Sequence, residues 1–549
     1  MELLQVKNLN FTYPKQTVPA VEQVSFSINR GEFCLLMGAS GCGKTTLLRL
    51  LKSQIAPYGE KSGELLYRER SVSEANVAEI GFVGQNPDEQ IVTDKVWHEL
   101  AFGLENMGLS REVIRRRTAE MAGYFGIQDW YHKNTDALSG GQKQLLNLAA
   151  VMVMQPRLLL LDEPTAQLDP IAAADFIATL QKLNRELGLT VLLAEHRLEE
   201  IFPIADRVLV MEQGRLLYND APKAVCVHMK GDSLFAGLPA AARIWNGLQI
   251  ACECPLTVRE GRDFLDEYFS GITGSVPVSE QKNKNTPAIE ANGIWFRYEK
   301  DAPDILRGLS LSVYEGEIFS ILGGNGSGKT TTLHILAGLD RPYKGKCRIF
   351  GKKMSAYTGN SLYRNTLAML PQNPKTMFVK STVEADFCEI LSAQNLPKAE
   401  QVPRIARLAQ EFDITPLLHR HPYDLSGGQM QKCALVKLLL TEPKLLLLDE
   451  PTKGMDAFSK QKFGALLRRF RQSGMTVLLV SHDIEFAAEY SDRCGLFFDG
   501  EVLSAGAPND FFAGNRFYTT AAGRIAGEHF ENAVLCSEVI SLCKGALSE

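Results

Sequence analysis

Short apolar runs alternate with longer segments of helical spacing along the chain. EFCLLMG (32–38), RLLLLD (157–162) and TVLLAEH (190–196) are too short for helices and lack the alternation of a half-exposed strand. They therefore predict fully buried strands. KTTLLRLLK (44–52) comes soon after the first run and has its apolar residues at helical spacing. Strands of this kind with helices between them predict an α/β fold built on a mainly parallel sheet.

The pattern occurs twice in the same order, which indicates a tandem duplication. GASGCGKTT begins at Gly38 and GGNGSGKTT at Gly323, LSGGQ begins at Leu138 and again at Leu425, and LLLLDEPT begins at Leu158 and again at Leu445. The offset between the copies is nearly constant and far longer than the period of a solenoid repeat. The chain is therefore expected to contain two complete domains of the same fold.

The duplication also indicates how the chain is divided. Between Gln85 and Leu138, and between Gln372 and Leu425, helical periodicity without strand runs predicts a helical insert in each domain. SVPVSEQKNKNTP is polar and lacks apolar periodicity, so it predicts a linker. The predicted segments are domain 1 (1–235), a helical extension (236–274), the linker (275–287), domain 2 (288–514) and a C-terminal helical extension (515–549).

Composition indicates a soluble protein. The 549 residues are 45% hydrophobic and 22% charged, as in ordinary globular proteins, and the net charge of -5 gives no general attraction to nucleic acid. The chain shows neither a signal-peptide pattern nor an apolar run of about 18 residues. We expect a cytosolic protein, so that any membrane role requires a separate membrane-embedded partner. The 11 cysteines are scattered without zinc spacing, and are expected to be reduced thiols.

Each copy contains the pattern G-x-x-x-x-G-K-[ST] between a predicted strand and a predicted helix. Glycines let backbone N–H groups turn toward phosphate oxygens, and the helix that follows points its positive end at the same anion. Lys44 and Lys329 are expected at the β- and γ-phosphates, and Thr45 and Thr330 at Mg²⁺. The predicted ATP-binding residues are Gly38, Ala39, Ser40, Gly41, Cys42, Gly43, Lys44, Thr45 and Thr46, and in the second copy Gly323, Gly324, Asn325, Gly326, Ser327, Gly328, Lys329, Thr330 and Thr331.

Two acidic residues end a buried strand in each copy. Asp162 and Asp449 suit Mg²⁺, directly or through water. The adjacent Glu163 and Glu450 suit a general base that polarises the attacking water. Cys42 lies within the first phosphate loop and is a candidate for alkylation.

The phosphate loop, LSGGQ, LLLLDEP and a later His, in that order, resemble an ATP-binding cassette (ABC) ATPase over nearly the whole chain. The resemblance implies the following roles. Tyr13 and Tyr298 stack on adenine; Gln85 and Gln372 contact Mg²⁺ and the attacking water; Ser139, Gly141, Ser426 and Gly428 are signature contacts to the γ-phosphate; Asp169 and Asp456 are aspartates that act across the paired domains; His196 and His482 are switch histidines at the γ-phosphate.

In this family the signature faces the phosphate loop of the other domain, which implies head-to-tail pairing around two ATP molecules. Site one combines Lys44, Thr45, Asp162 and Glu163 with Ser426 and Gly428; site two combines Lys329, Thr330, Asp449 and Glu450 with Ser139 and Gly141. Neither copy lacks a consensus residue. The sequence therefore predicts two sites that both hydrolyse ATP.

Three tasks are open to such a motor. It can energise a membrane importer, act on ribosomes, or serve DNA repair. Zinc-finger cysteine pairs, an N-terminal iron–sulfur cysteine cluster and a long helical linker are not found in the sequence, which disfavours the repair and ribosome alternatives. GFVGQNPDEQIVTDKVWHELAFGLENMGL resembles the corresponding region of energy-coupling factor (ECF) transporter ATPases, which drive import of vitamins or transition-metal ions.

The ECF resemblance implies a membrane scaffold subunit and a substrate-binding membrane subunit, with the chain peripheral on the cytoplasmic face and no nucleic acid bound. Asp88 and Glu89 are expected to receive an Arg from the scaffold. The simpler alternative is that Asp88 caps a helix, and both can hold together. In the second copy Lys375 and Thr376 take their places. The sequence therefore predicts two unequal docking surfaces.

Overall fold

The computed structural model describes residues 1–277, 286–515, 518–527 and 529–548. Contacts divide the chain into two units. The first comprises Met1–Phe264 with Asp456–Phe458, and the second Leu265–Met455 with Ser459–Glu549. Each unit contains one copy of the duplicated domain, and we call the copies cassette 1 and cassette 2.

Cassette 1 is built around a six-stranded sheet of order β10-β9-β3-β8-β7-β6. Its strands are parallel except for the β9–β10 pair. Every residue of β3, β7 and β8 is buried, which confirms the strands predicted from continuous apolar runs. The strands are β3 (Phe33–Gly38), β6 (Ile80–Val83), β7 (Leu158–Asp162), β8 (Thr190–Ala194), β9 (Arg207–Glu212) and β10 (Arg215–Asp220); helices α1 (Lys44–Leu50) and α6 (Pro170–Leu187) connect them.

A second, antiparallel sheet of order β2-β1-β4-β5 was not part of the prediction of a mainly parallel fold. It consists of β1 (Glu2–Thr12), β2 (Val21–Asn29), β4 (Glu60–Tyr67) and β5 (Arg70–Ser71). The signal was the alternation in VEQVSFSIN, where Val21, Val24, Phe26 and Ile28 are buried and the residues between them are partly or fully exposed. One buried face and one wetter face are what an antiparallel sheet permits.

The insert of cassette 1 is helical, as predicted. It contains α2 (Pro87–Gln90), α3 (Val96–Asn106), α4 (Arg111–Tyr124) and α5 (Gly140–Met152). Ser110 caps α4 and Ser139 caps α5 with side-chain oxygens that accept from backbone N–H groups, which favours helix starts at these positions. Beyond β10 come α7 (Pro222–His228), α8 (Ala240–Leu248) and α9 (Val258–Tyr268); the division between the two units falls within α9.

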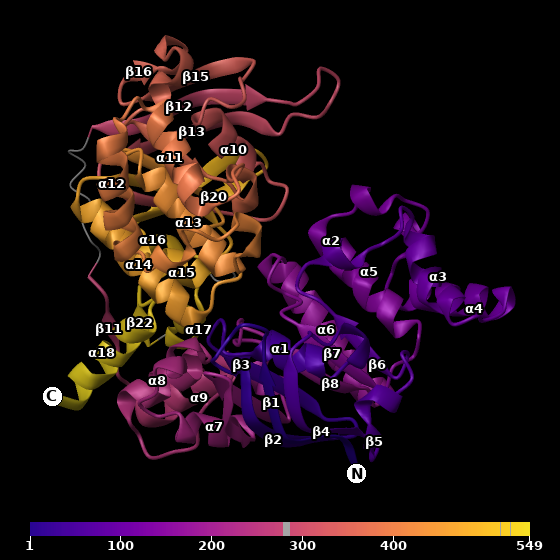
Figure 1. Ribbon diagram of the computed structural model, residues 1–549. Helices are drawn as coiled ribbons and strands as arrows, with labels where there is room; N and C mark the ends of the chain where they lie inside the picture. Colours follow the sequence, from indigo (N-terminus) through magenta and orange to yellow (C-terminus); the bar gives the residue numbers. More distant parts are fainter. Residues whose placement is uncertain (278–285, 516–517, 528, 549) are drawn as a thin grey trace. The chain divides into compact units, whose positions relative to one another are not determined.

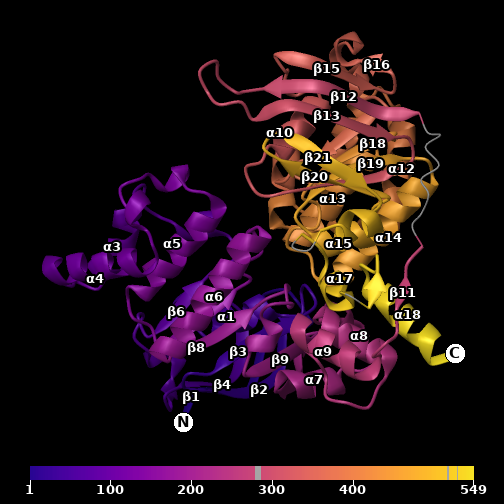
Figure 2. The same cartoon turned by 180° about the vertical axis from the view of Figure 1, so that it is seen from behind.

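Cassette 2 repeats this architecture, with sheets of order β17-β18-β19-β14-β20-β21 and β13-β12-β15-β16 (Figure 2). Its strands are β12 (Pro287–Phe296), β13 (Leu306–Tyr314), β14 (Ile318–Leu322), β15 (Lys344–Ile349), β16 (Lys352–Lys353), β17 (Leu367–Leu370), β18 (Leu445–Asp449), β19 (Thr476–Ser481), β20 (Arg493–Phe498) and β21 (Glu501–Gly506). Its helices are α10 (Lys329–Leu336), α11 (Val383–Ala393), α12 (Lys398–Glu411), α13 (Gly427–Leu439), α14 (Ala457–Gln472) and α15 (Ile484–Tyr490). The antiparallel sheet of cassette 2 was likewise not part of the prediction of a mainly parallel fold.

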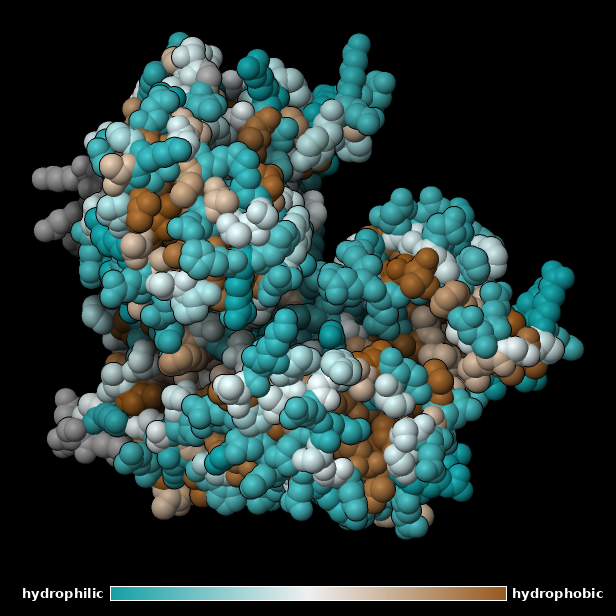
Figure 3. Space-filling view, in the orientation of Figure 1, coloured by the Kyte–Doolittle hydropathy of each residue, from teal (hydrophilic) through white to brown (hydrophobic). Residues whose placement is uncertain are grey.

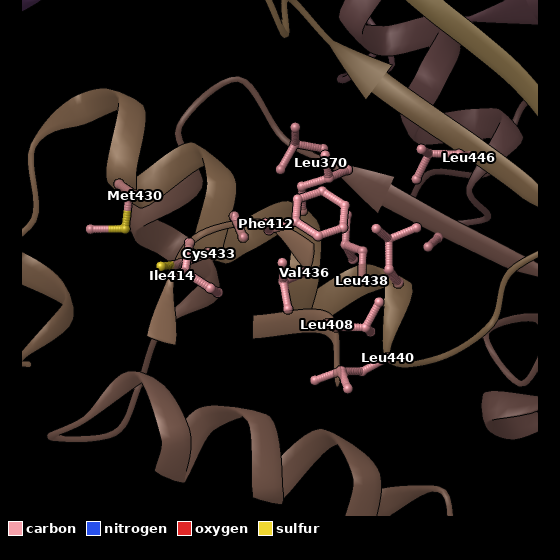
Figure 4. Close-up of a cluster of buried hydrophobic side chains, with 14 of the residues drawn as sticks. Leu370, Leu408, Phe412, Ile414, Met430, Cys433, Val436, Leu438, Leu440 and Leu446 are labelled. Carbon is pink, nitrogen blue, oxygen red and sulfur yellow. The ribbon is translucent and has the colours of Figure 1, made fainter. Parts of the chain in front are cut away.

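One hydrophobic cluster joins the sheet of cassette 2 to its helical insert. Leu370 from β17 and Leu446 from β18 belong to the same cluster as Leu408 of α12, the adjoining Phe412, and Val436 of α13 (Figure 4). Burying a side chain of this size contributes about 1.5–3 kcal/mol. The insert is therefore packed on the strand that leads into Gln372.

The C-terminal region of the second unit contains α16 (Pro508–Ala513), α17 (Ala521–Ala526) and α18 (Cys536–Ser548). Two short strands, β11 (Gly274–Ser275) and β22 (Phe530–Glu531), pair in parallel. Nearby, Nε2 of His529 lies 2.6 Å from a carboxylate oxygen of Asp266. Ser275 belongs to the predicted linker, whose residues 278–285 lie outside the described part of the chain.

The surface is mostly hydrophilic on the face seen in Figure 3, with hydrophobic residues in small groups. Of the helices formed by the described residues, none is both long enough and apolar enough to cross a membrane.

Candidate ATP sites

Each phosphate loop connects a buried strand to a helix. Gly41 and Gly43 have φ values of 81° and 104°, and Gly326 and Gly328 have values of 72° and 110°. A Cβ atom at Gly43 would lie 2.2 Å from the carbonyl oxygen of Ala20. Only glycine fits such positions without strain. The loops therefore have the form of an anion cradle at a helix N-terminus.

The loop lysines are buried and held by their own loops. Nζ of Lys44 donates to the carbonyl oxygens of Gly38 at 2.9 Å and Ala39 at 3.2 Å. Nζ of Lys329 donates to Gly323 at 2.9 Å and Gly324 at 2.7 Å. Both ammonium groups thus lie at the loops that the sequence identified.

A hydroxyl and a carboxylate meet at the end of each central strand. Oγ1 of Thr45 donates to Asp162 at 3.1 Å, and Oγ1 of Thr330 donates to Asp449 at 3.2 Å. Burial raises the pKa of Asp162 to about 6, and also that of Asp449 to about 6. A cation would relieve the cost of burying these charges, and hydroxyl and carboxylate oxygens are ligands that Mg²⁺ prefers. The residues present therefore fit the predicted metal.

Glu163 is held by three neighbours. Nε2 of His196 lies 2.8 Å from Oε1, Nε2 of Gln85 donates to Oε2 at 3.0 Å, and Nζ of Lys44 lies 3.9 Å from Oε1. Burial alone would raise the pKa of Glu163, but the hydrogen bond and charge of His196, together with the charge of Lys44, bring it below the usual value. Glu163 is therefore an ionised acceptor whose direction is fixed.

Glu450 has the same arrangement. Nε2 of His482 lies 2.9 Å from Oε1, and Nε2 of Gln372 donates to Oε2 at 3.1 Å. Burial opposes ionisation here too, yet the close contact and charge of His482, the charge of Lys453 and the hydrogen bond from Gln372 lower the pKa of Glu450 to about 2. The backbones of Glu163 and Glu450 have φ values of 47° and 48°, an uncommon conformation for these residues that clusters at functional sites.

The signature serines begin helices α5 and α13. Ser139 forms a capping box with Gln142, and Ser426 forms one with Gln429. Gly141 and Gly428 lie in the first turn of the same helices. Asp169 caps α6 by accepting from the N–H of Ala172 at 2.8 Å. The positive helix ends are therefore presented together with the signature residues.

The predicted adenine-stacking tyrosines lie beside the phosphate-loop helices. Oη of Tyr13 is 3.0 Å from Oγ1 of Thr46, and Oη of Tyr298 is 3.2 Å from Oγ1 of Thr331. Cys42 is only 5% exposed, and burial raises the pKa of its thiol. Because the thiolate is the reactive form, this environment does not favour the predicted alkylation.

Glu195 is a buried residue that the sequence reasoning missed. Its carboxylate accepts from the N–H and the hydroxyl of Thr165 and from the N–H of His196 at 2.8 Å. It is 1% exposed, and its hydrogen bonds connect the segment after β7 to His196. The equivalent residue in cassette 2 is Ser481, whose hydroxyl accepts from the N–H of Asp483. The difference between AEHR and SHDI was the available signal.

The segment VGQNPDEQ is held from several sides. Asn86, and not Asp88, caps α2 by accepting from the N–H of Asp88 at 3.2 Å, so the predicted capping role of Asp88 is wrong. Asp88 instead lies 2.6 Å from Nζ of Lys143. The side chain of Gln90 accepts from the N–H of Gly84 at 2.9 Å and donates to the carbonyl of Phe82 at 3.0 Å. The turn is therefore fixed within the cassette.

Comparison with known proteins identifies the class of this protein. The family model described as ABC transporter matches residues 21–166 and 306–453. The chain belongs to the ABC transporter ATP-binding family, whose members are ATPases, and it carries two ATPase domains.

Two similar proteins align with this chain over nearly their full length. A Bacillus anthracis protein, provisionally named ABC transporter ATP-binding protein, is 41% identical over 98% of both chains. A Bacillus subtilis protein, provisionally named HMP/thiamine import ATP-binding protein YkoD, is 31% identical over 93% of both chains. A solved structure of cbiO1 from Clostridium perfringens, described as part of the ABC transporter complex cbiONQ, is 31% identical; it aligns with 43% of this chain and 97% of its own, with a TM-score of 0.38.

Proposed function

We propose that this ATPase energises the import of a small molecule, a vitamin or a metal ion, through a separate membrane complex of ECF type. The observation that carries the proposal is the similarity, over 93% of both chains, to a protein named for HMP/thiamine import. The segment VGQNPDEQ, with its resemblance to ECF ATPases, supports the same conclusion.

Hydrolysis is assigned to groups that occur in both cassettes. Glu163 and Glu450 accept a hydrogen bond from the attacking water, because both carboxylates are ionised and fixed. His196 and His482 orient those carboxylates and face the γ-phosphate. Lys44 and Lys329 neutralise phosphate charge. Mg²⁺, held by Thr45, Asp162 and Gln85 or by Thr330, Asp449 and Gln372, would supply further charge stabilisation.

The two cassettes are proposed to pair head to tail, so that each ATP also meets the signature of the other cassette. Ser426→Arg should then weaken ATP binding at the Lys44 loop and spare the Lys329 loop. Photolabelling with an azido-ATP analogue under conditions without turnover, followed by peptide mapping, distinguishes the two. Loss at the Lys329 loop alone would contradict the pairing.

The proposed partners are a membrane scaffold subunit and a substrate-binding membrane subunit, with the chain peripheral on the cytoplasmic face. The full chain carrying an affinity tag should recover both from detergent-solubilised membranes, identified by mass spectrometry. Cytosol prepared without membranes provides the matched control. Recovery with ribosomes or nucleic acid and no integral membrane protein would replace transport with the alternative function.

A further inference from the structure

One face of α5 grips the segment that carries Gln85. Nζ of Lys143 lies 2.6 Å from a carboxylate oxygen of Asp88. One residue along the helix, Nε2 of Gln144 donates to the carbonyl of Gly84 at 3.2 Å. One turn further, Nδ2 of Asn147 donates to the carbonyl of Pro87 at 3.3 Å. Three side chains of one helix therefore hold both ends of a five-residue segment, which we call the latch.

Two of the latch side chains are buried amides. Gln144 and Asn147 are each 1% exposed, and their side-chain oxygens have no hydrogen-bond partner among the described residues. The amides cannot simply be reversed, because each nitrogen faces a carbonyl oxygen. The hydrogen bond of each buried amide therefore goes to the Gln85 segment, which calls for an explanation beyond packing.

The latch connects the segment that carries Gln85 to the helix that begins at the signature residue Ser139. Gln85, within the held segment, donates to Glu163 at 3.0 Å. Ser139 caps the N-terminus of α5, the helix that carries the latch side chains. A rigid helix moves as one body, so a shift of Gln85 at the γ-phosphate displaces Ser139 as well.

Cassette 2 lacks this arrangement within the described residues. Lys375 stands in place of Asp88, Met430 in place of Lys143, and Ala434 in place of Asn147. Its remaining amide, Gln431, bonds the carbonyl of Pro451 instead of the Gln372 segment. The helix α13 is thus tied to the segment that follows Glu450. It also reaches the turn after Gln372 through Lys437, whose Nζ donates to the carbonyl of Met377 at 2.5 Å, beyond the residues 371–375 that correspond to the held segment.

We propose that Lys143 and Asn147 are positioning residues for ATP hydrolysis, which couple Gln85 to the signature helix in cassette 1 only. Neither side chain touches a reacting group. The coupling acts through Asp88 and Pro87, and so through the segment that also resembles the scaffold-docking region.

Charge exchange tests the latch in the full chain, without any membrane partner. Asp88→Lys and Lys143→Asp should each lower kcat for ATP by about two- to fivefold, with KM nearly unchanged. The double variant Asp88→Lys/Lys143→Asp restores the ion pair and should restore kcat. Asn147→Ala, which imports the residue of cassette 2, should lower kcat in the same way.

Two matched controls separate positioning from folding. Lys375→Asp alters the equivalent residue of cassette 2, and Lys7→Asp breaks an exposed ion pair with Glu64 in the same unit; both should leave kcat unchanged. Unfolding temperatures, measured in parallel, should match across the variants of Asp88, Lys143, Lys375 and Lys7. Unchanged kcat in the single variants, or a double variant as slow as the singles, would overturn the proposal. A loss of kcat that follows the unfolding temperature would overturn it as well.

Discussion

The two cassettes hold their reacting groups alike but support them differently. The His-to-Glu distances are 2.8 and 2.9 Å, and the Gln-to-Glu distances are 3.0 and 3.1 Å. Behind these groups, Glu195 corresponds to Ser481, and Lys143 corresponds to Met430. Equal contacts at the reacting groups therefore do not require equal surroundings. The cassettes are expected to share a chemical step and to differ in what moves with it.

The strongest test compares the two proposed general bases, Glu163 and Glu450. Glu163→Gln and Glu450→Gln each keep the size of the side chain and remove the charge that accepts a proton. Each is expected to lower ATP turnover by about a hundredfold or more if the sites work together. Steady-state phosphate release by the full chain measures this. If one of the two substitutions left turnover unchanged, only the other cassette would hydrolyse ATP.

The next effect concerns the stability of cassette 2. Asp386 is fully buried and pairs with Nζ of Lys437 at 2.9 Å. Lys437→Met would leave a buried carboxylate without its cation, at a cost of about 3–5 kcal/mol. The matched acid of cassette 1, Glu99, accepts from the N–H groups of Val92 and Thr93, as Asp386 does from those of Val379 and Lys380, but it has the Thr93 hydroxyl in place of a cation. Chemical denaturation should show Thr93→Ala to be milder, and equal losses would contradict this.

A smaller effect is expected at His196, the proposed switch histidine. Glu195→Ser imports the residue of cassette 2 but leaves the Thr165 and His196 N–H groups without their acceptor. Unpaired buried donors cost about 1–3 kcal/mol, so kcat should fall by about tenfold as His196 loses its support. ATP turnover is the measurement, and Ser481→Ala is the matched control. An unchanged kcat would mean that Glu195 does not position His196.

The smallest effect is expected at the phosphate loop. Cys42→Ser imports the residue that cassette 2 has as Ser327, whose hydroxyl donates to the carbonyl of Gly324 at 2.9 Å. We expect the KM for ATP to change by less than about twofold, since the side chain points into its own loop and core. A larger change would show that this position contributes to the difference between the cassettes.

Local patterns were enough to predict the strands and loops that carry the chemistry. β7 and β18 are continuous apolar runs, and the glycines of the phosphate loops stand at fixed spacing, so both could be read without a structure. The contacts that hold these strands and loops in place could not be predicted in this way. Lys143 and Asp88 are 55 residues apart, and no local pattern indicates that the two charges meet.

Contacts of buried polar residues were missed for the same reason. Glu195 looked like an ordinary residue beside His196, because its partner Thr165 lies 30 residues away. The antiparallel sheets were missed because their strands are half-exposed, and alternation is a weaker signal than a continuous apolar run.

The short pair of strands β11 and β22 has a mechanical consequence. It pairs residues just before cassette 2 with residues near the C-terminus. The chain between them is therefore a loop closed by the hydrogen bonds of this strand pair. Such a closure reduces the conformations open to the unfolded chain between its ends. A force applied to the segment before cassette 2 would first act on the two-residue pair of β11 and β22 and on the His529–Asp266 ion pair.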